Sequence, residues 1–209
     1  MSEKNFVPAL QHPALTPIYD WVLIFSGLGP SFKRRLAPLA DMQNKPGEII
    51  LDIGSGTGTH ARILADAYPL MTVIGIEPDP TLITFSEKFP TRSNLTYYKA
   101  DASCLPYADE SVAYVFSTIV FHHLTPTEKA VALAEIYRVL KPDSTFILVD
   151  WGQLRVSAYR HFLYLVEQKN CIDSHFDGTF LEQIKENKFR LEKQIRVKRS
   201  GMWLYTFKK

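Results

Sequence analysis

The sequence feature that most constrains the fold is a run of three glycines at alternate positions, Gly54, Gly56 and Gly58, directly after a short apolar segment. Residues 48–53 form that segment and are typical of a buried strand, whereas residues 59–67 have a helical pattern. Glycine can adopt the positive φ of a tight turn, and it lets another molecule approach a backbone that carries no Cβ. The helix start adds free N–H groups and positive potential. The pattern predicts a strand, a ligand-binding turn and a helix.

The spacing of the glycines separates this turn from two other nucleotide-binding turns. A dinucleotide fingerprint has Gly-x-Gly-x-x-Gly, but here the third glycine comes one residue early and Thr59 stands in its place. A P-loop needs a lysine after its last glycine, and none follows Gly58. A turn without a ligand is the structural alternative, although such a turn needs only one glycine. The spacing therefore disfavours a nicotinamide-dependent oxidoreductase.

Strand and helix patterns alternate along most of the chain. A helical pattern over 18–40, broken at 27–30, precedes them, and two alternating runs around Ser200-Gly201 predict a closing hairpin. Such alternation implies parallel strands joined by crossovers. We expect an α/β fold with a doubly wound, mostly parallel seven-stranded sheet and an antiparallel C-terminal hairpin. The expected strands are 48–53, 71–76, 95–100, 112–121, 145–150, 190–198 and 202–207, and the helices between them are 59–67, 80–89, 126–140, 154–169 and 177–188.

Four segments within about residues 47–151 resemble class I S-adenosylmethionine-dependent methyltransferases, in particular the small-molecule type 11 group. The turn Leu51–Gly58 resembles motif I of that family, and Asp101–Tyr107 resembles the loop before its fourth strand. Phe116–Leu124 matches the His-His-Leu tail common in small-molecule methyltransferases, and Glu135–Pro142 matches the helix before the fifth strand. The resemblance implies a Rossmann-like methyltransferase fold with S-adenosylmethionine as the cofactor.

The resemblance also assigns roles to single residues. The glycine turn would pass beneath the methionine part of the cofactor. Glu77, at the tip of the second strand, would accept hydrogen bonds from both ribose hydroxyls, as acids do in NAD enzymes. Asp101 and the Ala102 N–H would bind the adenine edge, and Tyr19 would stand beside the sulfonium. A solvated acid, an ordinary turn aspartate and a packed tyrosine are the structural alternatives. The implied cofactor-binding residues are Tyr19, Asp52, Gly54, Ser55, Gly56, Glu77, Pro78, Asp101, Ala102 and Ser117.

Methyl transfer from a sulfonium is an in-line displacement, so the protein mainly positions the acceptor and excludes water. A general base is needed only where the acceptor carries a proton that must leave. The candidate catalytic residues are His122, His123 and Asp150, which lie at the carboxyl ends of predicted strands. Histidines that pack or cap the turn are the alternative. Cys104 and Cys171 lack the spacing of a zinc site, so no metal is expected.

The distribution of charge bears on the choice of acceptor. The formal net charge is +2, but residues 185–209 hold nine lysines and arginines against two glutamates. This basic end could attract RNA or an anionic membrane, or it could protect an edge hairpin from aggregation. We favour protection, because no RNA-specific motif accompanies the charge. The chain has no apolar run of membrane-spanning length and no signal-peptide pattern, so we expect a cytoplasmic protein.

Two segments with different tasks are expected. Residues 1–40 would form an N-terminal helical lid over the acceptor, and residues 41–209 the methyltransferase domain. Aromatic side chains in residues 1–40 and 151–188 favour a small, partly apolar acceptor, with a homodimer as a compatible assembly and nucleic acid disfavoured as a partner. The alternatives are an RNA methyltransferase and an inactive, methyltransferase-like binding protein. The intact glycine turn, Glu77 and Asp101 argue against the inactive protein.

Overall fold

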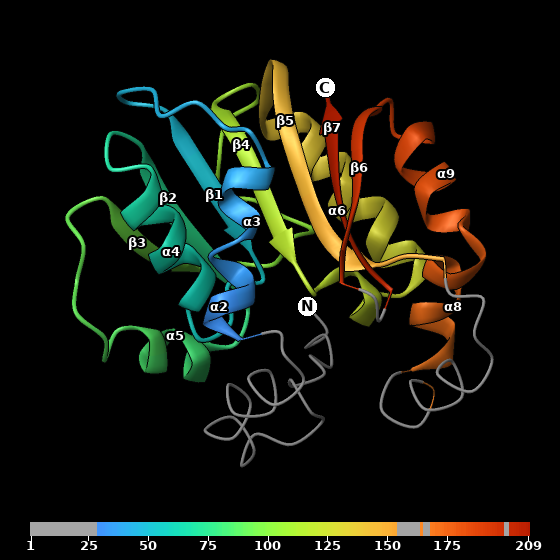
Figure 1. Cartoon of the computed structure of the whole chain (residues 1–209), viewed down its shortest axis with the longest axis horizontal. Coiled ribbons are helices and arrows are strands. Elements are labelled where there is room, and N and C mark those ends of the chain that lie inside the picture. Colours follow the sequence, from blue (N-terminus) through green and yellow to red (C-terminus); the bar gives the residue numbers. More distant parts are fainter. Residues whose placement is uncertain (1–28, 154–163, 165–167, 199–200) are drawn as a thin grey trace.

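A computed structural model describes residues 29–153, 164, 168–198 and 201–209. Seven strands form one sheet in the order β3-β2-β1-β4-β5-β7-β6 (Figure 1). The first five strands are parallel, and β7 is antiparallel to both β5 and β6. The expected α/β fold with a mostly parallel sheet and an antiparallel C-terminal hairpin is therefore confirmed. The strands are β1 (Ile49–Ile53), β2 (Thr72–Glu77), β3 (Leu95–Lys99), β4 (Val112–Thr118), β5 (Leu140–Trp151), β6 (Arg190–Lys198) and β7 (Met202–Lys208).

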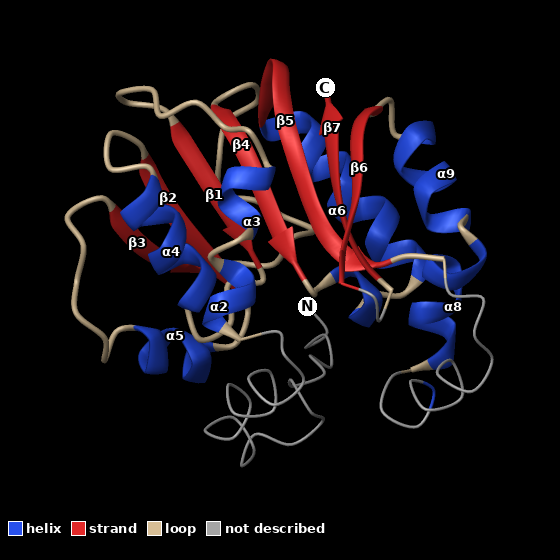
Figure 2. Ribbon diagram, in the orientation of Figure 1, coloured by secondary structure: helices blue, strands red, loops and turns tan. Residues whose placement is uncertain are grey.

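Helices cover both faces of this sheet (Figure 2). Those described are α2 (Pro30–Lys33), α3 (Leu36–Leu39), α4 (Thr59–Ala67), α5 (Pro80–Ser86), the 3-10 turn η3 (Phe121–His123), α6 (Pro126–Val139), α8 (Lys169–Asp177) and α9 (Thr179–Glu186). One hydrophobic core joins α2, α4 and α8 to the sheet through Phe32, Leu64 and Phe176. The other core joins α6 and α9 to the opposite face through Leu133 and Ile184. Burial on both faces explains why the central parallel strand β1 is a nearly continuous apolar run.

Strand β4 ends earlier than predicted. The sequence pattern suggested a strand to residue 121, but the strand stops at Thr118. Ile119 then adopts a φ of 61°, a left-handed value that is strained for a β-branched residue. The chain continues into η3, which carries His122 and His123. The two histidines therefore lie on a turn after the strand and not at its last residues.

Two further boundaries differ from the predictions. Strand β5 begins at Leu140 and not at residue 145, because the chain passes directly from the end of α6 into the sheet. The helix expected over residues 177–188 corresponds to α9, whereas α8 was not predicted as a separate helix; the two meet at Gly178. Gly178 has a φ of 90°, a conformation that ends one helix and starts the next in a new direction.

Some predictions concern residues outside the described part of the chain. These are residues 18–28 of the N-terminal helical pattern and most of the helix expected over 154–169. The division at residue 40 between a lid and a methyltransferase domain therefore stays a prediction. Within the described residues, no helix has both the length and the apolar character that crossing a membrane requires.

The direction of strand order changes between β1 and β4. From β1 the chain adds β2 and β3 on one side, and then β4 and β5 on the other. In open α/β sheets, ligands bind in the crevice at the carboxyl ends of the strands where this change occurs. The glycine turn follows β1, and Ser117 near the end of β4 pairs in register with Ile53. The sheet thus brings these predicted binding residues together at the carboxyl ends of its parallel strands.

Candidate active site

The three glycines of the turn all have positive φ, but they are needed for different reasons. A Cβ on Gly54 (φ 67°) would lie 2.4 Å from a methyl group of Val120, and a Cβ on Gly58 (φ 73°) would lie 2.3 Å from the Tyr97 hydroxyl. These two glycines allow neighbouring side chains to pack against the turn. A Cβ on Gly56 (φ 55°) would meet no atom within 4 Å. The backbone at Gly56 therefore borders open space, as a ligand-binding turn requires.

Glu77 connects the end of β2 to the glycine turn. The Gly56 N–H donates to its Oε2 at 2.9 Å, and the Asp79 N–H donates to its Oε1 at 3.1 Å. The residue is only 5% exposed. Burial raises the pKa of Glu77 to about 7, although the two N–H donors act in the opposite direction. A ligand that brings further hydrogen-bond donors to this carboxyl group would favour its charged form.

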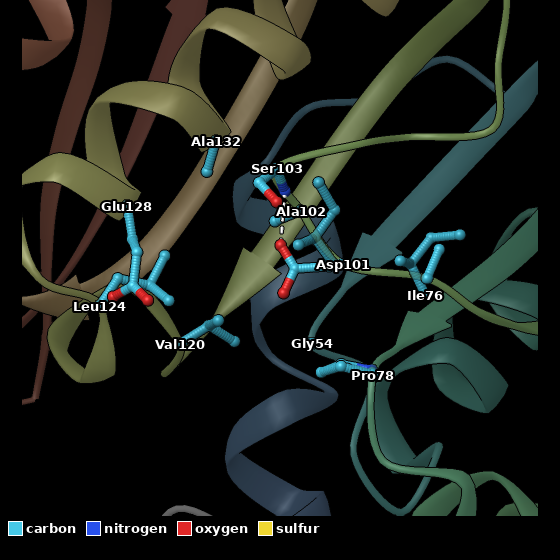
Figure 3. A pocket seen from close by; sticks show the side chains of 12 residues that line it. Gly54, Ile76, Pro78, Asp101, Ala102, Ser103, Val120, Leu124, Glu128 and Ala132 are labelled. Atoms are coloured by element: carbon cyan, nitrogen blue, oxygen red, sulfur yellow. Dashed lines mark hydrogen bonds between the residues drawn. The ribbon is translucent and has the colours of Figure 1, made fainter. Parts of the chain in front are cut away.

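A pocket lies at the carboxyl ends of β1, β2 and β3, beside α6 (Figure 3). Four of the predicted binding residues, Gly54, Pro78, Asp101 and Ala102, line it. Asp101 is exposed, and its Oδ1 accepts a hydrogen bond from the Ser103 N–H at 2.7 Å. The remaining lining residues are Ile53, Ile76, Ala100, Ser103, Val120, Leu124, Glu128 and Ala132.

The other predicted binding residues are buried beneath the glycine turn or lie outside the described chain. Asp52 is 1% exposed and its Oδ1 is 3.0 Å from the Nδ1 of His60, a residue that the sequence analysis missed. Ser55 and Ser117 are 4% and 0% exposed. Tyr19 belongs to the residues that the structure does not describe. Buried polar side chains thus gather at the ends of β1 and β4.

The three predicted catalytic residues lie together. Asp150 is fully buried, and its Oδ1 receives hydrogen bonds from His122 Nδ1 at 2.8 Å and from the Trp151 N–H at 2.7 Å. Burial acts to raise the pKa of Asp150, but the neighbouring His122 and His175 and these hydrogen bonds outweigh burial, so the pKa lies below its ordinary value. His122 is 2% exposed. His123 is exposed, and its ring centroid lies 3.9 Å from that of His122.

Helix α8 is attached beside this pair by polar side chains that the sequence analysis also missed. Lys129 on α6 is 0% exposed, and its Nζ donates to the Cys171 carbonyl and to Ser174 Oγ. Burial lowers the pKa of Lys129 to about 8. His175 Nδ1 donates to the Trp151 carbonyl at 2.9 Å, and burial lowers its pKa to about 4, so its imidazole is neutral at pH 7.

The chain has a doubly wound fold with a pocket at the carboxyl ends of its parallel strands, and comparison with known proteins shows what it is similar to. The family model of the methyltransferase domain matches residues 51–148. A solved methyltransferase of Haloferax volcanii, in complex with the Trm112 methyltransferase activator, has a TM-score of 0.76 at 18% identity, over 93% of this chain and 96% of that chain. The chain is thus similar to methyltransferases in sequence over residues 51–148, and it shares the fold of a solved one.

Two other similar proteins have more specific names. A ubiquinone/menaquinone biosynthesis C-methyltransferase of Syntrophotalea carbinolica is 28% identical, over 66% of this chain and 59% of its own length. The solved phosphoethanolamine N-methyltransferase 2 of Haemonchus contortus, in complex with S-adenosyl-L-methionine, has a TM-score of 0.68 at 19% identity, over 90% of this chain and 44% of that chain. The chain thus spans about three fifths of the curated relative, and the solved structures support the fold.

Proposed function

We propose that the protein transfers a methyl group from S-adenosylmethionine to a small, partly apolar acceptor. The arrangement around Glu77 carries this proposal. The buried carboxyl group is bonded to the Gly56 N–H at the one glycine of the turn whose Cβ would enter open space, beside a pocket that Asp101 and Ala102 line. An extended ligand with a diol and a heterocycle suits this arrangement. When bound, the cofactor supplies an electrophilic methyl group on its sulfonium.

The residues present fit this cofactor. Glu77 would accept hydrogen bonds from the ribose hydroxyls, and Asp101 with the Ala102 N–H would bind the adenine edge. The backbone of the glycine turn would lie beneath the methionine part. Among the described residues, no hydrogen bond reaches Ser55 Oγ or Ser117 Oγ, although both atoms are buried. Buried polar atoms without partners are costly and call for a ligand or water. Tyr19 and Pro78 complete the proposed set.

The buried His122–Asp150 pair is the proposed acid–base unit. The Asp150 carboxylate accepts the Nδ1–H of His122, which leaves Nε2 of that imidazole as the basic atom. His122 Nε2 would take the proton that the acceptor loses when it is methylated. Asp150 orients the ring and offsets the charge that forms on it. His123, whose ring lies tilted beside that of His122, would contact the acceptor.

Two observations support a small and partly apolar acceptor. Trp151 is buried and packs edge-on against His122, with ring centroids 6.4 Å apart, so the surroundings of the proposed acid–base unit are partly apolar. The relatives include proteins named for methylation in ubiquinone/menaquinone biosynthesis and for phosphoethanolamine N-methylation. A quinone precursor, a lipid precursor or a secondary metabolite would suit such a surface.

The basic C-terminal segment lies at one side of the sheet, where β7 and β5 separate β6 from β4 and the pocket. Arg190 and Lys208 lie near the start of β5, whereas Arg196 pairs with Trp203 at the carboxyl end of β5. RNA is therefore kept as the alternative acceptor. A gel shift with RNA tests this alternative. Salt-dependent binding would favour an RNA acceptor, and no shift at low salt would exclude one.

Calorimetric titration with S-adenosylmethionine, S-adenosylhomocysteine and NAD tests the proposed cofactor. We expect micromolar binding of both adenosyl ligands and none of NAD. Gly56→Val and Asp101→Leu should lose binding; Asp101→Leu should retain the melting temperature, whereas Gly56→Val should lower it about as much as a valine at another glycine of positive φ, because a β-branched residue is strained there. Gly47→Val is the matched control, because Gly47 also has a positive φ (75°) and open space around it, yet it precedes β1, at the other end of that strand from the glycine turn. Unchanged affinity in both site variants would refute this placement of the cofactor.

A further inference from the structure

His60 forms a buried polar pair with Asp52 beneath the glycine turn. It lies in the first turn of α4, is 2% exposed, and packs edge-on against the Phe116 ring with centroids 4.5 Å apart. Its Nδ1 lies 3.0 Å from Asp52 Oδ1 and 3.4 Å from Thr118 Oγ1. The pair therefore joins the end of β1 to the start of α4 and to the last residue of β4.

The Asp52–His60 pair leaves two buried polar atoms without hydrogen-bond partners among the described residues. A charged carboxylate has no proton to give, so His60 Nδ1 must donate to Asp52 Oδ1, and the Nε2 of a neutral imidazole then carries a lone pair. Within the part of the chain that the structure describes, neither Asp52 Oδ2 nor His60 Nε2 has a hydrogen-bond partner, although both atoms are buried. Both free atoms are acceptors. A ligand group that donates several hydrogen bonds and carries positive charge would satisfy them.

The position of the pair selects one end of the proposed cofactor. Glu77 and Asp101 lie at the ends of β2 and β3, and they would hold the ribose and adenine. An extended ligand that begins there and follows the glycine turn reaches β1 and β4 with its other end. In S-adenosylmethionine that end carries an α-ammonium group. The α-ammonium group has the hydrogen-bond donors and the positive charge that the two unpaired acceptor atoms need.

We propose that His60 is a positioning residue for the cofactor's amino-acid end. It fixes the Asp52 carboxylate by one oxygen and so presents the other oxygen to the α-ammonium group. This inference rests on the proposed function, because it needs the cofactor to occupy the glycine turn. It adds a selectivity that the adenosine contacts cannot give, namely a preference for adenosyl ligands with an intact amino acid.

Two ligands that share adenosine separate this role from a structural one. S-adenosylhomocysteine has the α-ammonium group, whereas 5′-methylthioadenosine ends at the thioether. Calorimetry on the full chain should show that His60→Phe weakens S-adenosylhomocysteine by about tenfold or more and 5′-methylthioadenosine by less than about twofold. His60→Asn should restore the wild-type ratio, because the asparagine amide can donate where Nδ1 does. Glu77→Gln is the reference variant and should weaken both ligands together.

The outcomes distinguish the inference from the function beneath it. If the wild-type chain binds neither ligand, the proposed function fails and this inference fails with it. If the wild-type chain binds both ligands and His60→Phe lowers both affinities equally or neither, His60 only shapes the loop and the inference is overturned. Should His60→Phe not fold, Asp52→Asn carries the same test. It keeps an acceptor for Nδ1 but removes the charge, so the same selective loss of S-adenosylhomocysteine is expected.

Discussion

At the scale of single residues, Glu77 is subject to opposing demands of folding and binding. Its carboxyl group is buried and receives only two backbone N–H donors, so burial raises its pKa from 4.5 to about 7. Below pH 4.5 the group is protonated in the folded and the unfolded chain alike. As pH rises through 7 the folded chain must ionise a buried carboxyl group, and stability is lost. Hydrogen-bond donors from a ligand would offset that loss.

Glu77→Gln separates the two demands. The variant cannot ionise, so its unfolding free energy should gain about 2 kcal/mol relative to wild type between pH 5 and pH 8. Urea denaturation at the two pH values measures this change, and calorimetry with S-adenosylhomocysteine should show weakened binding in the same variant. Equal pH profiles for both proteins would contradict a raised pKa at Glu77.

Part of the site could be predicted from residue patterns, and part required the fold. The glycine turn, Glu77 and Asp101 follow predicted strands directly, so their shared edge could be inferred from the order of strands. His60 and Lys129 were missed, although both lie on buried helical stripes, with Leu64 and with Ile136 respectively. A polar residue at a position where the helical pattern expects an apolar one can be recognised in the sequence, and it indicates a buried polar contact. Which partners satisfy it depends on packing between elements distant in sequence.

At the scale of elements, the interiors of strands and helices were predicted better than their ends. The predicted helix 59–67 coincides with α4, since a glycine turn precedes it and Pro69 follows it. The predicted end of β4 was wrong because residues 119–121 are as apolar as the strand itself. Only the strained φ at Ile119 takes these residues out of the sheet. Hydrophobic pattern does not report such a backbone change. The sequence shows a glycine at position 178, but it does not show that the helix axis changes direction there.

Lys129 gives a prediction at this scale, because it ties α6 to α8. Lys129→Met removes the hydrogen bonds to Cys171 and Ser174, but it also removes the cost of burying an ammonium group. We expect the unfolding free energy to change by no more than about 1–2 kcal/mol, while amide exchange in α8 becomes about tenfold faster. Hydrogen exchange with mass spectrometry measures both helices. Lys141→Met, which removes a surface pair with Glu48, is the control and should leave α8 unchanged.

At the scale of the whole molecule, the alternation of strands and helices determines most of the architecture. Parallel strands joined by helices must place their carboxyl ends at one edge, and a short turn between β6 and β7 makes those two strands antiparallel neighbours. The sequence pattern did not show that β7, and not β6, pairs with β5. That choice leaves β6 as an edge strand at the limit of the sheet (Figure 1).

The exposed charges of β6 are expected to keep this edge from pairing with another chain. Arg190, Lys193 and Arg196 are exposed on the strand, and charged side chains on edge strands oppose sheet-to-sheet association. Replacing Lys193 and Arg196 by threonine retains strand propensity while removing the charge. The weight-average mass from light scattering should then rise about twofold or more with protein concentration, with S-adenosylhomocysteine binding unchanged. The matched variant Arg34→Thr with Lys45→Thr loses the same charge away from the sheet edges and should keep the wild-type mass. If both variants associate equally, net charge and not the edge controls solubility.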